Sequence, residues 1–154
     1  MSEQEKNKNT MKIFEKCINT ADEKLAEELI DSKASFSTPA SPDLLYGGKG
    51  YLSVVYYLRK GFSDINWKIE EMVAEKNIVV VRWTCSGTHD GEFMGVKPTG
   101  KKFSICVMNF YYFNNEGKII KDIAAEGMIG ILRAIGICKV IYYLTFLIFY
   151  YIIL

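Results

Sequence analysis

The sequence predicts a single α+β domain in which three N-terminal helices pack on the concave face of a curved antiparallel sheet. Up to residue 61, apolar side chains recur at the three- and four-residue spacing of amphipathic helices. From residue 65 onward the chain is rich in the β-branched and aromatic residues that favour strands. A chain of 154 residues is also long enough to bury one hydrophobic core. Helices gathered on one face of such a sheet leave a hollow suited to a small molecule.

The first helix is expected to begin after Glu3, because Met11, Phe14 and Ile18 share one helical face. The second is expected over about 21–32. Thr20 and Glu23 stand three apart at its start, the spacing at which a hydroxyl and a carboxylate satisfy free backbone amides reciprocally.

Residues 34–50 are rich in proline, serine and glycine, which predicts a loop with one short strand. The third helix follows and stops at Gly61. Two antiparallel strands are then expected on either side of a tight turn at 75–77.

The segment 103–113 is apolar on both of its alternating faces, which predicts a central strand covered on both sides. A turn at 114–117 leads to the last strand, at 118–126, and a short helix closes the domain at 127–136.

Composition argues against several classes of protein. The 19 basic and 18 acidic side chains nearly balance, which disfavours a nucleic-acid-binding face. The four cysteines are scattered and the chain has one histidine, so neither a zinc site nor a disulfide framework is expected. The polar N-terminus has no apolar core of the kind that secretion signals carry, and a cytoplasmic location is expected.

The C-terminal segment 137–154, "ICKVIYYLTFLIFYYIIL", stands apart from the domain at 1–136. As a helix, the fifteen residues from Val140 would span about 22 Å, short of a hydrocarbon core of roughly 30 Å. Three interpretations stay open: a membrane anchor through 140–154, an element buried in a dimer interface, and an accidental extension past the domain.

Residues 87–103, "GTHDGEFMGVKPTGKKF", surround the only histidine, His89, with four of the twelve glycines. In the structural interpretation, these residues form a long hairpin loop, and the glycines and the proline serve only to shape its turns. The alternative makes His89, with Glu92 three residues on, the rim of a ligand site.

Two stretches, "VRWTCSGTHDGEFMGVKPTGKKF" at 81–103 and "GKIIKDIAAEGMIGILRAIG" at 117–136, resemble the SnoaL-like polyketide cyclases, also called ester cyclases. The resemblance runs from about Lys12 to Gly136. It implies the cone-shaped fold shared with nuclear transport factor 2, scytalone dehydratase and ketosteroid isomerase. It further implies a homodimer that pairs through the open sheet face, and intramolecular aldol chemistry that needs neither metal nor cofactor.

The resemblance also locates the acid/base groups, and there the sequence departs from the family. The last strand of the family commonly reads His-Trp-Asp, and the matching positions hold Asp122, Ile123 and Ala124. Asp122 and Glu126 share a strand face with Ala124, so either carboxylate is a candidate base. Asn109 stands where the family carries its polar partner and is the candidate donor to an oxyanion.

Two hypotheses follow. In the first, the protein is a cofactor-free enzyme that abstracts a proton from a small apolar carbonyl compound and cyclises or isomerises it, because burial beside aromatic walls tunes a carboxylate for such work. In the second, a domain of the same fold binds a small ligand and has lost the base. The candidate catalytic residues are Asp122, Glu126, Asn109 and His89, and the candidate ligand-binding residues are Trp83, Phe93, Met94, Tyr56 and Tyr111.

Overall fold

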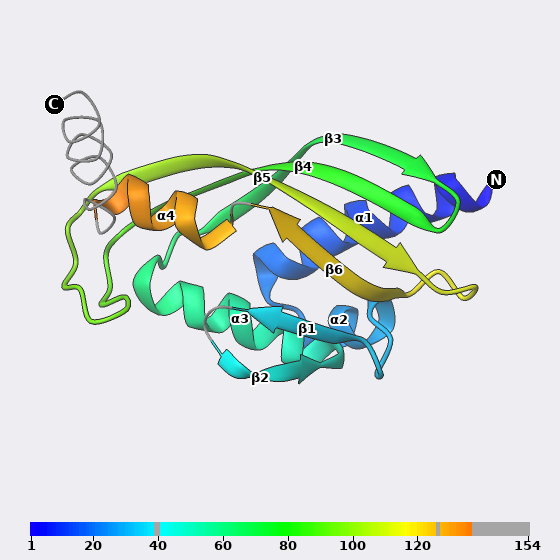
Figure 1. The fold of residues 1–154 in the computed structure, drawn as a ribbon, viewed down its shortest axis with the longest axis horizontal. Helices are drawn as coiled ribbons and strands as arrows, with labels where there is room; N and C mark the ends of the chain where they lie inside the picture. Colours follow the sequence, from blue (N-terminus) through cyan, green and yellow to red (C-terminus); the bar gives the residue numbers. More distant parts are fainter. Residues whose placement is uncertain (39–40, 126, 137–154) are drawn as a thin grey trace, which may run out of the picture.

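A computed structural model describes residues 1–38, 41–125 and 127–136 of the chain (Figure 1). Helices α1 (Glu3–Thr20) and α2 (Glu23–Leu29) come first, followed by the short strands β1 (Ser35–Thr38) and β2 (Ser41–Tyr46) and by helix α3 (Gly47–Gly61). The long strands are β3 (Asn66–Glu75), β4 (Ile78–Thr88), β5 (Lys102–Phe113) and β6 (Ile119–Ala125), and α4 (Gly127–Ile135) follows them. The α+β class is therefore confirmed, and the strands β1 and β2 separate the third helix from the first two. The predicted tail at 137–154 and the candidate base Glu126 lie outside the described residues.

Helix α1 buries the face that its spacing predicts, since Met11, Phe14 and Cys17 are fully buried. The start of α2 differs from the prediction. The capping side chain is that of Asp22, which accepts a hydrogen bond from the Leu25 amide at 3.0 Å. Thr20 instead ends α1, and its hydroxyl donates to the Lys16 carbonyl. Carboxylates and hydroxyls are both good N-caps, so local sequence alone did not distinguish Asp22 from Thr20.

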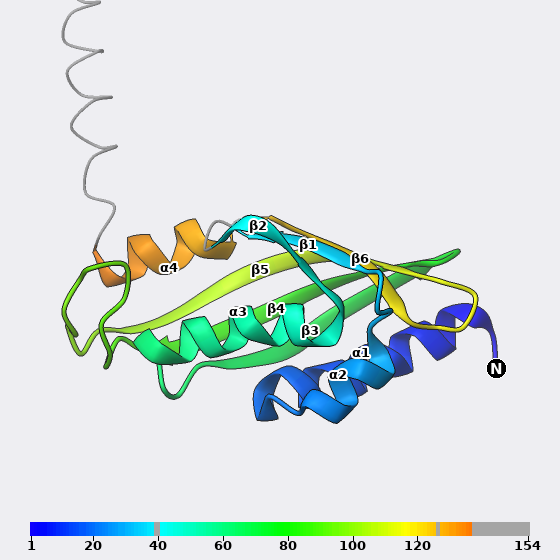
Figure 2. The ribbon, with the colours of Figure 1, turned by 90° about the horizontal axis from the view of Figure 1, so that it is seen from below.

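The segment predicted as a loop with one strand contains two strands, which pair antiparallel. This β1–β2 hairpin lies beside the start of β6 (Figure 2), and its neighbour Ile30 forms a parallel bridge with Ile119. Phe36 on β1 is buried in the core. Antiparallel pairing with β2 and burial of Phe36 together favour a strand in a segment whose prolines and serines predict a loop.

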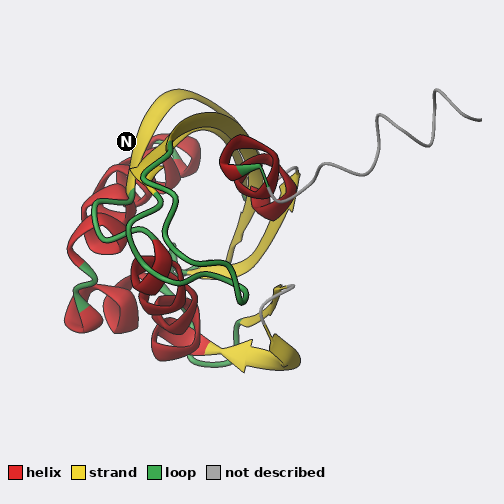
Figure 3. Ribbon diagram, turned by 90° about the vertical axis from the view of Figure 1, so that its left-hand side faces the viewer, coloured by secondary structure: helices red, strands yellow, loops and turns green. Residues whose placement is uncertain are grey.

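The four long strands form one antiparallel sheet in the order β3-β4-β5-β6. The turn between β3 and β4 falls at 76–77, as predicted, with Lys76 at φ 51°. The sheet curves around the space that the helices close from the other side (Figure 3). The side chains that alternate toward this space along β4 are buried: Val79, Val81, Trp83 and Cys85.

Strand β5 lies in the interior of the sheet as predicted, but the prediction that both of its faces are covered is wrong for the described chain. Met108 and Phe110, on the outer face, are 49% and 45% exposed. From Ile105 to Phe113 both faces of β5 carry mostly apolar or aromatic residues, with Asn109 as the exception. The apolar character of both faces therefore identified an interior strand of the sheet. It did not distinguish a covered outer face from an exposed one.

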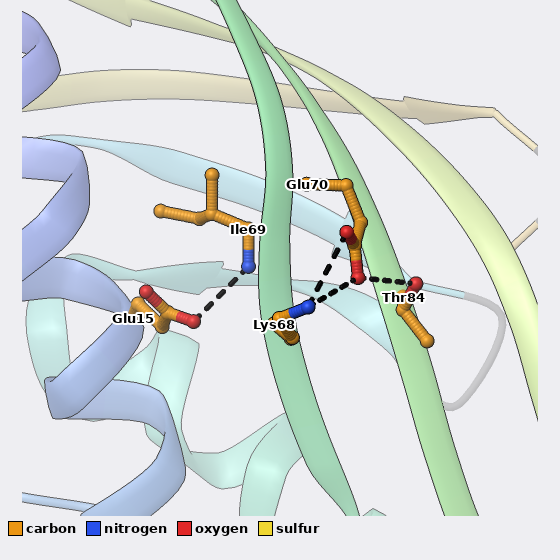
Figure 4. A network of polar contacts seen from close by, with 5 residues as sticks. All are labelled: Glu15, Lys68, Ile69, Glu70 and Thr84. Carbon is orange, nitrogen blue, oxygen red and sulfur yellow. Dashed lines mark hydrogen bonds and ion pairs between the residues drawn. The ribbon is translucent and has the colours of Figure 1, made fainter.

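Strand β3 is an edge strand whose free backbone groups are met by side chains of α1. The Ile69 amide donates to the Glu15 carboxylate at 3.0 Å, next to the irregular register between Ile69 and Glu71 (Figure 4). Asn19 bonds both backbone groups of Trp67, accepting from its N–H at 2.8 Å and donating to its carbonyl at 2.6 Å. These bonds satisfy an edge that would otherwise be open to another strand, and they fix α1 against the sheet.

Candidate active site

A cavity of about 210 Å³ lies between the helices and the inner face of the sheet. Helix α3 supplies one wall, strands β4, β5 and β6 supply the opposite wall, and Ile131 of α4 contributes at one end. Most of the lining is apolar or aromatic. The lining residues are Ile18, Phe36, Tyr51, Val54, Val55, Leu58, Trp67, Trp83, Cys85, Ile105, Val107, Asn109, Tyr111, Asp122, Ala124 and Ile131.

Asp122 is the one carboxylate among these lining residues, and it is partly buried. Burial raises its pKa from 3.8 to about 6, although hydrogen bonds from Asn109 and Tyr51 act in the opposite direction. Asn109 donates from Nδ2 to Oδ1 at 2.7 Å, and the Tyr51 hydroxyl donates to Oδ2 at 3.2 Å. A carboxylate with such a pKa is ionised at neutral pH and is a far better proton acceptor than a free aspartate.

Strand pairing explains how Asn109 and Asp122 meet. Asn109 on β5 lies opposite Ala124 on β6, and Tyr111 lies opposite Asp122. The Asn109 amide therefore reaches Asp122 diagonally, two residues along the same inward face. At the position where the family commonly has its acidic residue, Ala124 leaves only a methyl group on the cavity wall. The carboxylate of Asp122 enters the same cavity one step along the strand.

Two tyrosine hydroxyls extend the polar group beside Asp122. Burial, followed by the negative charge of Asp122, raises the pKa of both Tyr51 and Tyr111 well above 10. Trp83 Nε1 is buried without a hydrogen-bond partner among the described residues. Donors thus accumulate on the side of the cavity where the carboxylate lies.

The cavity brings together four of the predicted site residues, namely Asp122, Asn109, Trp83 and Tyr111. The others lie elsewhere. Tyr56 faces outward from α3, where its hydroxyl donates to Glu23 at 3.2 Å, and Met94 is 53% exposed. Phe93 is buried, but it packs on Phe62 with ring centroids 4.8 Å apart and does not line the cavity.

His89 is fully buried in the loop after β4 and is also absent from the cavity lining. Its Nδ1 lies 3.0 Å from the Thr99 hydroxyl, and its ring packs against Phe62. Its backbone amide donates to the Lys101 carbonyl, and its carbonyl accepts from the Gly100 amide. These contacts hold the two arms of the loop together, as expected if the motif has a structural role.

Tyr51 is a site residue that the sequence patterns did not predict. The signal was present, because Tyr51 shares the apolar face of α3 with Val54, Val55 and Leu58. One hydroxyl on an otherwise apolar buried face requires a polar partner from elsewhere in the fold. The identity of that partner, Asp122, depends on the packing of α3 against β6, 71 residues away along the chain.

The described residues include no group of three or more His, Cys, Asp or Glu side chains placed to hold a metal ion. Cys85 lines the cavity, and burial raises the pKa of its thiol to about 12, so it remains a neutral wall residue.

The fold is that of an α+β domain whose curved sheet and helices surround a largely apolar cavity with one carboxyl of raised pKa in its described lining. Residues 8–135 match the SnoaL-like polyketide cyclase family. The chain belongs to this family, as the resemblance of its motifs implies.

Solved structures share the fold of this chain. TsrD from Streptomyces laurentii superposes with a TM-score of 0.74 at 19% identity, over 86% of this chain and 96% of that protein. IdmH from Streptomyces antibioticus gives 0.70 at 24% identity, over 84% and 98% of the two chains. Identities at this level show a shared fold rather than a shared reaction.

A comparison with curated protein sequences finds no significant match. Of the helices in the described part of the chain, none is long and apolar enough to cross a membrane.

Proposed function

We propose that the protein is a cofactor-free enzyme that removes a proton next to a carbonyl group, with Asp122 as the base, and so cyclises or isomerises its substrate. The observation that carries this proposal is the placement of Asp122, the one carboxylate of the described cavity wall, with a pKa raised to about 6. General-base catalysis is most effective when the pKa lies near the working pH. Membership of a cyclase family supports the same class of reaction.

The cavity also limits the substrate. About 210 Å³ exceeds the roughly 150 Å³ that accommodates benzene, so a compound of one or two rings fits inside. The lining residues include no lysine, arginine or histidine that would pair with an anion. We therefore propose a neutral carbonyl compound as the substrate, because an anion would enter an apolar site unpaired and beside Asp122.

Proton exchange tests this proposal. We expect the protein to catalyse deuterium exchange at the carbon next to the carbonyl of 2-tetralone, a neutral two-ring ketone, and of β-keto esters, followed by NMR. Asp122→Asn is expected to lower the rate at least about 10²-fold, since the amide accepts no proton. Glu126→Gln is the matched control and is expected to keep most of the rate.

Three results would count against this assignment. Loss of activity in Glu126→Gln alone would transfer the role of base to Glu126. Full activity in Asp122→Asn would exclude Asp122. Ligand binding by the parent protein without any exchange would favour the second hypothesis, a binding domain that has lost its base.

We further propose that two copies pair through the outer face of the sheet. Val73, Val80, Phe110 and Ile123 are successive pairing partners across all four strands, and three of them are at least 45% exposed. Met108 lies next to this row at 49% exposed. A continuous apolar row on an open sheet is typical of an interface, because exposure to water costs free energy that pairing recovers.

Phe110→Glu is expected to convert a dimer into a monomer, because it places a charge in the middle of the row. Light scattering coupled to size exclusion measures the change. Ile13→Glu on α1 is the matched control, since Ile13 is 46% exposed and lies away from the sheet face. A monomeric parent protein, or equal dissociation in both variants, would refute pairing through this face.

A further inference from the structure

The two oxygens of the Asp122 carboxylate have different partners. Oδ1 accepts from Asn109 at 2.7 Å, which is short for an amide donor, and Asn109 is only 6% exposed. Oδ2 accepts from the Tyr51 hydroxyl at the longer distance of 3.2 Å. One of the two N–H groups of the Asn109 amide is therefore committed to the carboxylate by this short bond. Tyr51, on the opposite wall, makes the weaker bond.

Proton abstraction would change the acceptor that Tyr51 prefers. The C–H bond next to the substrate carbonyl breaks, the proton forms an O–H bond with Asp122, and the electron pair left behind forms the enolate. The negative charge thereby leaves the carboxylate and appears on the substrate oxygen. A hydroxyl donates more strongly to a charged oxygen than to a neutral one, so the best acceptor for Tyr51 becomes the enolate.

The distances agree with this change. The base acts on the carbon next to the carbonyl and the donor acts on the carbonyl oxygen, only two bonds away, so the two side chains must lie close together. The Tyr51 hydroxyl meets this requirement at 3.2 Å from Oδ2, and both side chains line the cavity.

We propose that the Tyr51 hydroxyl is the donor that binds the substrate carbonyl oxygen and stabilises the enolate, in place of Asn109. This inference rests on the proposed role of Asp122 as base. No oxidant, reductant or metal is needed, because the step only moves a proton and an electron pair.

The surroundings of Tyr51 support the assignment. Its ring is held edge-on between Phe14 and Phe36, with centroids at 5.1 and 5.0 Å, so the hydroxyl has a fixed position. A preorganised donor of this kind loses little when charge develops on the substrate.

Tyr51→Phe tests the inference, because it removes the hydroxyl and keeps the ring contacts. The measurement is the rate of 2-tetralone exchange at saturation across pH 5 to about pH 9, with thermal unfolding as a check on folding. At the upper end Asp122 is ionised, and Tyr51 in the parent remains protonated because its pKa is well above 10. We expect a loss of about 10²- to 10³-fold there, the usual effect of removing one oxyanion donor.

Tyr57→Phe, on the same helix, is the matched control and is expected to exchange at the parent rate, because Tyr57 does not line the cavity. A role of Tyr51 limited to setting the pKa of Asp122 predicts something else: the rate of Tyr51→Phe would fall at low pH and recover to the parent value near pH 9. That recovery would overturn the inference and leave Asp122 as the base. Absence of exchange in the parent would overturn both.

Discussion

Asp122→Asn is expected to make the protein more stable at pH 7 while it removes the proposed base. Burial holds the pKa of Asp122 at about 6 against 3.8 in an unfolded chain, so folding penalises the charged form. A change of this size corresponds to roughly 3 kcal/mol. Because the carboxyl is only partly buried, we expect a gain in the free energy of unfolding of about 1 to 3 kcal/mol.

The raised pKa of Asp122 also determines how the stability of the parent protein changes with pH. Between pH 3.8 and about 6, the folded state binds more protons at Asp122 than the unfolded state does. The contribution of this residue to stability is therefore full below the lower value and is lost as the pH rises through the upper one. Asp64 and Asp90 have lowered pKa values and act in the opposite direction.

Urea unfolding of the parent and of Asp122→Asn at a series of pH values separates these contributions, because the other carboxylates are common to both proteins. The difference in unfolding free energy should grow from pH 4 to about pH 6 and then level off. A variant that is less stable than the parent at every pH would show that the bonds to Asn109 and Tyr51 outweigh the cost of burying the charge.

Gly91→Ala is expected to cost at least about 3 kcal/mol of stability, or to prevent folding. A Cβ at this position would lie 1.8 Å from the carbonyl oxygen of Lys60, near the end of α3. The obstacle is backbone, and it cannot move freely because the Gly91 and Asp90 amides both donate to the Gly61 carbonyl at 3.1 Å. The loop and the helix would have to separate.

Gly95→Ala in the same loop is the matched control. Gly95 has φ 76°, and a Cβ added to it would meet nothing within 4 Å, so only the left-handed backbone opposes alanine, at about 1 kcal/mol. Chemical denaturation measures both variants. Equal losses would mean that the close approach to Lys60 does not determine the role of the glycine.

The glycine-rich loop at 87–103 shows that a sequence motif can have a structural role rather than a catalytic one. Its glycines and its histidine are part of the resemblance to the family, and the structure explains two of them by contact: Gly91 lies against the end of α3, and His89 joins the two arms of the loop. A motif of this kind signals close packing as readily as chemistry. The residue types alone do not separate the two, because a buried imidazole suits either use.

Part of the candidate site could be predicted from the sequence, namely Asp122 and its partner Asn109. Alternation along β6 showed that Asp122 and Ala124 share one face, and strand pairing then placed Asn109 within reach. Tyr51 was not predictable as a partner of Asp122, because its role depends on how α3 docks against the sheet. Phe93 and Met94 were predicted as pocket residues from the motif, and the loop that carries them packs against the end of α3 instead.

Sequence by itself determined the class of fold, the order of the helices and long strands, the family, and a short set of carboxylates that includes Asp122. Periodicity and local motifs are properties of neighbouring residues, so a single chain displays them directly. Only the tertiary structure decided which of the polar side chains meet in the cavity, and that Asp122 has a raised pKa between Asn109 and Tyr51. Burial and cross-chain hydrogen bonds depend on residues brought together by packing, and their distances do not follow from spacing along the sequence.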